Sequence, residues 1–167
     1  MNAIADRLDV VNRWVGSVVR WAALLMMLLQ FAIVLLRYVF GVSEIALNEG
    51  VLYMHATLFM LAAGYTLQVD GHVRVDIFYA KATPRTRARI DLFGHLLLLM
   101  PSVSIILYWS WPTVRSSWAI LEGPISVGGI PALFLLKSLI PAFCVLLLLQ
   151  SLALVLRNLA SLASGRH

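Results

Sequence analysis

The stretch DGHVRVDIFYAKATPRTRARID, residues 70–91, decides how this chain folds. It is the longest strongly polar run in a sequence that is 61% hydrophobic, and it carries five of the thirteen lysines and arginines. Apolar sequence of similar length lies on either side of it. The stretch therefore divides the protein into two hydrophobic halves, and its positive charge helps to set their orientation in a membrane.

Four apolar runs are long enough to be membrane spans: residues 21–40, 47–67, 90–111 and 130–156. A helix of about 20 mostly apolar residues crosses the hydrocarbon core of about 30 Å. A soluble protein of 167 residues cannot bury four such helices, because too little of its surface would remain polar. We therefore predict an all-α integral membrane protein, with four transmembrane helices that form a single membrane domain.

Residues 1–20 have the pattern of an amphipathic helix. Asp6 and Asp9 stand where the positive region of a signal peptide would be, so we do not expect one. Apolar residues recur every three or four positions, with polar residues largely between them. The apolar residues are Ile4, Leu8, Val11, Val15 and Val18. This pattern predicts a separate helix that lies in the membrane interface, with Trp14 as an anchor. Docking on a partner subunit is the alternative.

The distribution of basic residues predicts the topology. The N-terminal segment, residues 70–89 and the tail carry ten lysines and arginines, whereas the other two connections carry only Arg37 and Arg115. Basic connections stay in the cytoplasm, so we place both termini and residues 70–89 there. The net charge of +5 then reflects topology and contact with membrane lipids, not nucleic-acid binding.

Local signals predict where helices begin and bend. Ser43 is the expected N-cap of the second span. Thr83 and Pro84 are the expected N-cap and first residue of the third helix, which should run to residue 111. Pro101 should kink that helix, and Pro131 fits the first position of the fourth.

A polar layer is predicted in the outer half of the membrane, where ionisable residues are candidates for function. By helical rise, Glu49, Lys137 and His55 lie about 3, 10 and 12 Å below the outer helix ends. We expect a Glu49–Lys137 pair with Asn48 and His55 as neighbours, because a buried charge is costly unless paired. Arg37 competes for Glu49. Lys137 extending outward with Glu49 in headgroup water, and a proton-relay role, are the alternatives.

No cofactor or enzymatic activity is predicted. His55 and His95 could hold a haem in a respiratory membrane anchor, but they differ in depth by about 10 Å or more. Because an imidazole must lie about 2 Å from the metal, one haem cannot join them. The sequence shows no phosphate loop or metal-ligand spacing. The spans also lack the breaks of a carrier, which indicates a scaffold that needs a partner.

Several short motifs carry a family resemblance. They are Arg37-Tyr38-Val39-Phe40-Gly41, Asn48-Glu49, Asp70-Gly71-His72-Val73-Arg74-Val75-Asp76, Pro84-Arg85, Gly128-Gly129-Ile130-Pro131 and Leu136-Lys137-Ser138-Leu139-Ile140-Pro141. With them, residues 15–158 resemble the small membrane subunit of tripartite ATP-independent periplasmic (TRAP) transporters, the DctQ-like family. The motif of residues 70–76 is the most specific part, and we expect Arg74 to bond Asp70 or Asp76 and fix its turn.

The resemblance implies a non-catalytic small permease subunit in a bacterial inner membrane. In such transporters a large multi-span subunit holds the substrate and sodium sites, and a periplasmic binding protein delivers an organic acid. The implied candidates for contact with the binding protein lie on the outer connections: Glu44, Trp118 and Glu122. An accessory subunit of a respiratory enzyme and a homo-oligomeric channel are the alternatives. The substrate is not readable here, because its contacts are expected on other chains.

Overall fold

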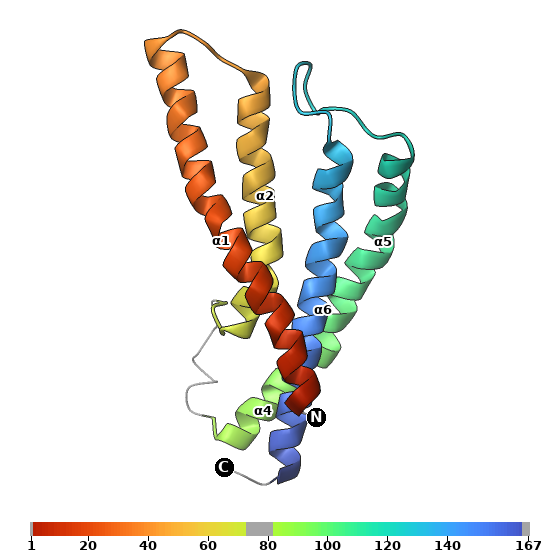
Figure 1. Ribbon diagram of the computed structural model, residues 1–167. Coiled ribbons are helices and arrows are strands. Elements are labelled where there is room, and N and C mark those ends of the chain that lie inside the picture. The colour runs from red at the N-terminus through yellow and green to blue at the C-terminus, as the bar shows by residue number, and fades with distance from the viewer. Residues whose placement is uncertain (1, 73–81, 165–167) are drawn as a thin grey trace.

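The computed structural model describes residues 2–72 and 82–164, and every regular element in these residues is helical (Figure 1). The elements are α1 (Asn2–Val39), α2 (Ile45–Gln68), α4 (Pro84–Phe93), the π-helix η1 (Gly94–Leu99), α5 (Met100–Ala119) and α6 (Leu133–Ser164). Four helical stretches are long and apolar enough to cross a membrane: Ile4–Val39, Ile45–Gln68, Pro84–Ala119 and Leu133–Ala163. They confirm the predicted four-helix membrane architecture.

The last helix, α6, is the centre of the bundle. It contacts α1, α2, α4, η1 and α5. In the most apolar 18-residue stretch of this span, 39% of the residues are buried, against 6% in the corresponding stretch of each of the other three spans. The small core of Val103, Cys144 and Leu147 joins α5 to α6. The helices fan out toward the end that carries residues 40–44 and 120–132, and both chain ends lie at the opposite end (Figure 1).

The expected separate helix over residues 1–20 is not present, because α1 runs without a break from Asn2 to Val39. No proline lies in α1, and Gly16 and Ser17 do not interrupt it. Two polar residues of the segment face the bundle, since Asp9 is 3% exposed and Asn12 is fully buried. Apolar residues of the expected membrane-facing side are exposed: Ile4, Val11 and Val18. The position of this segment relative to the membrane surface stays a prediction.

The third span is one long helical stretch with a widened turn. Thr83 caps α4 as predicted, since its side chain accepts a hydrogen bond from the Thr86 amide at 3.3 Å and Pro84 follows. The bend expected at Pro101 falls one turn earlier, in η1, and α4 is inclined to α5 (Figure 1). Proline lacks an amide hydrogen and collides with the carbonyl four residues before it, and a π-turn relieves that crowding. The stretch ends at Ala119, beyond the predicted residue 111.

Two predicted helix starts are shifted. The N-cap of α2 is Glu44 rather than Ser43, and its side chain makes no capping hydrogen bond. The fourth helix begins at Leu133, so Pro131 precedes it instead of occupying its first position. Before the fourth helix, the Ala132 amide donates to the Ile130 carbonyl at 2.8 Å, so residues 130–132 form a tight turn instead of the first helical turn.

Replacing Gly64 with Ala is expected to destabilise the bundle. A Cβ atom at position 64 would overlap Asn12 Oδ1 and lie 3.2 Å from Leu146 Cβ. Because Asn12 is fully buried, it cannot move without losing its hydrogen bonds, and overpacking of this kind costs about 1–3 kcal/mol. Thermal unfolding in detergent measures the change. Gly94→Ala is the control, since a Cβ there meets nothing within 4 Å; an equal shift in both variants would contradict the packing argument.

Candidate functional site

Near the N-terminal end of α2, the Glu49 carboxylate is buried and holds the loop between α5 and α6. Its Oε1 accepts a hydrogen bond from the Ser126 amide at 3.1 Å, and its Oε2 accepts one from the Ile130 amide at 2.8 Å. Glu49 is 6% exposed. A Cβ at Gly129 would overlap this carboxylate, so only glycine lets the loop backbone approach it. Two of the short sequence motifs, residues 48–49 and 128–131, are therefore in contact.

Lys137 does not pair with Glu49, contrary to the sequence prediction. Its Nζ donates instead to Glu122 Oε2 at 2.5 Å. Ser117 Oγ donates to the same oxygen at 2.5 Å, and the Glu122 amide donates back to the Ser117 carbonyl at 3.0 Å. The reason is the end of α5: Leu121 takes a positive φ of 45°, which turns the chain so that Glu122 faces Lys137.

A second contact closes the same end of the α5–α6 hairpin. Trp118 Nε1 donates to Ser138 Oγ at 2.7 Å, and the Trp118 and Phe134 rings meet edge to face at 4.7 Å. Lys137 and Ser138 are neighbours in sequence, so one turn of α6 holds both polar residues at the end of α5. Trp118 remains 46% exposed. Of the three outer candidates, Glu44 is fully on the surface, whereas the Glu122 carboxylate is engaged inside the hairpin.

The other members of the predicted polar layer lie on the surface of the chain. Arg37 is exposed near the end of α1. The exposed Asn48 donates from Nδ2 to the Glu44 carbonyl at 3.0 Å, one turn earlier in its own helix. His55 is exposed and stacks with Phe59, their ring centroids 6.4 Å apart. These three residues do not join Glu49, and whether they face a partner subunit stays a prediction.

The first two residues of the motif at 70–76 form the C-terminal cap of α2. Asp70 takes a positive φ of 58°. The Asp70 amide donates to the Leu67 carbonyl at 3.3 Å and the Gly71 amide donates to the Thr66 carbonyl at 2.9 Å. This pair of bonds is a Schellman motif with aspartate in the position that usually holds glycine. His72 is exposed. Arg74 and Asp76, with the bond expected between Arg74 and an aspartate, lie outside the described residues.

A buried polar network at the end near the chain termini was missed in the sequence. Gln150 of α6 is fully buried, donates to Asp9 Oδ1 at 2.9 Å and accepts from Asn12 Nδ2 at 3.0 Å. Arg157 donates to Asp9 Oδ2 and, at 3.0 Å, to Asp6 Oδ1. These contacts join the two ends of the chain. The available signal was the Gln150–Ser151 pair, which interrupts the longest apolar run.

His95 also lies against this part of α6. Its Nδ1 is 3.2 Å from Ser151 Oγ. Within residues 2–72 and 82–164, no group of three His, Cys, Asp or Glu side chains could hold a metal ion. The polar contacts at both ends thus connect helices and loops of the chain to one another.

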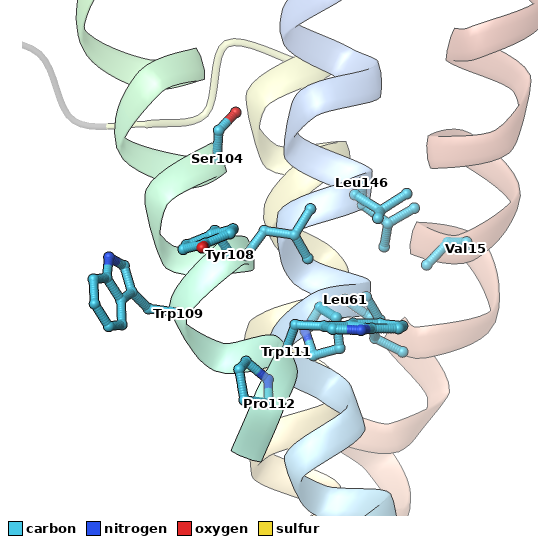
Figure 2. A pocket seen from close by; sticks show the side chains of 12 residues that line it. Val15, Leu61, Ser104, Tyr108, Trp109, Trp111, Pro112 and Leu146 are labelled. Atoms are coloured by element: carbon cyan, nitrogen blue, oxygen red, sulfur yellow. The ribbon is translucent and has the colours of Figure 1, made fainter. Parts of the chain in front are cut away.

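A large cavity lies between these two ends and is almost entirely apolar (Figure 2). It has a volume of about 1020 Å³ and opens between α1, α5 and α6, with Leu61 contributed by α2. Trp111 reaches across it, while Trp109 points away from the bundle (Figure 2). A cavity with this lining offers no charged group to a carboxylate or a cation. It suits a lipid tail or an apolar helix face.

Taken with four apolar spans, this geometry defines an integral membrane protein whose described buried charges hold its own loops and helices. A family model described as "Tripartite ATP-independent periplasmic transporters, DctQ component" matches residues 26–161. The chain belongs to this family, and it is therefore a small subunit of a TRAP transporter and a protein of the inner membrane. Comparisons with curated proteins and with solved structures gave no significant match.

Replacing Glu49 with Ala is expected to release residues 126–130. Hydrogen bonds to a charged group contribute about 1.5–3 kcal/mol, so the Ser126 and Ile130 amides should exchange with solvent roughly tenfold to a hundredfold faster. Hydrogen–deuterium exchange measures this. Glu44→Ala is the matched control, because the Glu44 side chain makes no cap hydrogen bond. Unchanged exchange in Glu49→Ala would contradict the proposed anchoring of the loop.

The Glu122–Lys137 pair is expected to weaken only in acid. Hydrogen bonds from Lys137 and then Ser117 lower the pKa of the Glu122 carboxyl below its ordinary value. A group with a lowered folded pKa stabilises the fold fully above its unfolded pKa of about 4.3, and that contribution is lost as pH falls through the folded pKa. The difference in melting temperature between wild type and Glu122→Gln should be constant from about pH 8 to 5 and shrink below about pH 4. A difference that shrinks near neutral pH would argue against this pair.

Proposed function

We propose that this chain is the non-catalytic scaffold subunit of a sodium-coupled, binding-protein-dependent importer of an organic acid. The observation that carries the proposal is the placement of its charges. Glu49, Glu122 and Asp9 are each engaged by groups of the same chain. The cavity of about 1020 Å³ is apolar. A pathway for an anion and sodium needs polar groups near the membrane midplane, so we assign that pathway to the large multi-span subunit.

The shape of the bundle supports a scaffold role. In the most apolar part of each span, 39% of the residues of α6 are buried, against 6% in each of the other three. The residues of α1 and α5 are mostly exposed, and those of α2 are mostly half-buried. Outward residues along α1 include Leu24, Met27, Leu28 and Phe31, which are 44–62% exposed. Lipid tails and the helices of a partner subunit are similarly apolar, so either can cover such faces. The polar contacts at both ends of the bundle would keep these apolar faces in a fixed arrangement while the partner subunit moves.

The outer connections are the proposed contact with the periplasmic binding protein. Glu44 is exposed, and Trp118 presents about half of its surface. The loop between α5 and α6 adds exposed apolar residues, with Val127 95% and Ile120 73% exposed. Glu49 and the Lys137–Glu122 pair fix this loop to the helices of the bundle. Glu122 therefore acts on this surface through the loop's conformation rather than through its own carboxylate.

Co-purification and reconstituted uptake test the proposal. A tagged copy extracted from native membranes in mild detergent should carry a large multi-span membrane protein with it. Proteoliposomes with both subunits and the binding protein should accumulate an organic acid from a panel, and replacing sodium with potassium should abolish accumulation. The control is this chain alone, which should transport nothing. Uptake by this chain alone would indicate a channel, and a haem absorbance band in the purified complex would indicate a respiratory anchor; either result would overturn the proposal.

A further inference from the structure

Two adjoining cavities open between α1 and α2 near the end that holds the chain termini. One has a volume of about 270 Å³ and is lined by Arg13, Ser17, Arg20 and Tyr65, with Leu58 and Ala62 at its apolar side. The other, of about 410 Å³, is more polar and is lined by Asp9, Arg13, Tyr65, Gln68, Val69 and Arg157. Arg13 and Tyr65 line both cavities, which therefore adjoin, and the pair is called the cleft below.

The cleft results from helix spacing and from one close approach. Arg13, Ser17 and Arg20 follow one another at intervals of four and three residues, which places them on one face of α1. Gly16 lies between them, and a Cβ there would come within 2.6 Å of Tyr65 Cγ. The backbone of α1 therefore packs directly on the Tyr65 ring. The Arg13 and Arg20 side chains line the cavity beside this contact.

The cleft carries an uncompensated positive charge. Arg157 is engaged by Asp6 and Asp9, and Asp9 is also bonded to Gln150. Arg13 and Arg20 are exposed, and among the described residues neither has a hydrogen-bond or ion-pair partner. Three arginines, Arg13, Arg20 and Arg157, stand against the two aspartates, so one positive charge is left over. The guanidinium groups of Arg13 and Arg20 are the ones that remain for a ligand.

The predicted span limits place the cleft at the headgroup layer of a bilayer and its water-facing edge. Arg20 directly precedes the first apolar run, and Arg13 lies about 10 Å farther along the helix. The headgroup region adds roughly 5–7 Å on each side of the hydrocarbon core, so Arg20 is expected within it and Arg13 at its water-facing edge. Trp14 and Trp21 are 68% and 59% exposed, as residues of an interfacial aromatic belt are. Leu58 and Ala62 extend the cleft toward the membrane centre, because α2 enters from the other side.

We propose that this cleft binds an anionic phospholipid. The phosphodiester lies between Arg13 and Arg20, within reach of the Ser17 and Tyr65 hydroxyls, and an acyl chain lies along Leu58 and Ala62. Basic pockets between transmembrane helices on the cytoplasmic side bind lipid headgroups of this kind. The apolar side of the cleft favours a lipid over free phosphate. The two unpaired arginines favour an anionic headgroup over a zwitterionic one.

Lipid titration of the purified protein tests the proposal. The full chain with its co-purifying subunits is delipidated in detergent and titrated with phosphatidylglycerol, and bound lipid is counted by native mass spectrometry. The double variant Arg13→Gln/Arg20→Gln should bind phosphatidylglycerol about 30-fold more weakly, at about 1 kcal/mol per basic residue. Ser17→Leu, which keeps both charges and fills the smaller cavity, should also weaken binding.

The matched control is Arg7→Gln/Arg115→Gln, which removes the same charge from exposed residues that line neither cavity. It should bind phosphatidylglycerol as wild type does. Phosphatidylcholine should bind at least tenfold more weakly than phosphatidylglycerol, and millimolar inorganic phosphate should not compete. The proposal fails if the control loses as much affinity as the cleft variant, if phosphatidylcholine binds equally well, or if inorganic phosphate displaces the lipid.

Discussion

The arrangement of the bundle depends on one buried amide. Gln150 is fully buried on the helix that all other spans contact, and both ends of its side chain are bonded to α1. An amide in an apolar interior is costly unless its hydrogen bonds are made, so rotation or sliding of α1 on α6 would be penalised. Gly64 of α2 then fits against Asn12 only in this register. Gln150 and Asn12 together thus position α1, α2 and α6 against one another.

The opposite end is fixed by a different kind of contact. There the buried Glu49 carboxylate accepts from loop amides, and Lys137 holds Glu122 at the end of α5. Between the two ends lies the apolar cavity of Figure 2. This arrangement of two polar ends and an apolar centre is the basis of the scaffold role proposed above.

Sequence patterns predicted the spans well and their polar contacts poorly. Hydropathy found four spans because the length of an apolar helix is set by bilayer thickness, and Thr83 was identified because an N-cap bonds within its own turn. Glu49 and Lys137 were correctly expected at the same end of the bundle, where both contact residues of the loop between α5 and α6, but they were wrongly paired. Helical rise gives the depth of a side chain and not its direction. The loop backbone that binds Glu49, and the turn at Leu121 that brings Glu122 to Lys137, have no local signature.

The sequence by itself determined the class of protein, the number of spans and the family, because these follow from apolar run lengths and short motifs. Only the tertiary structure decided that α1 is one continuous helix with Asp9 and Asn12 turned inward. In sequence these residues have the pattern of a water-facing side. Their partners, Gln150 and Arg157, are more than a hundred residues away, and the fold alone brings them within hydrogen-bonding distance.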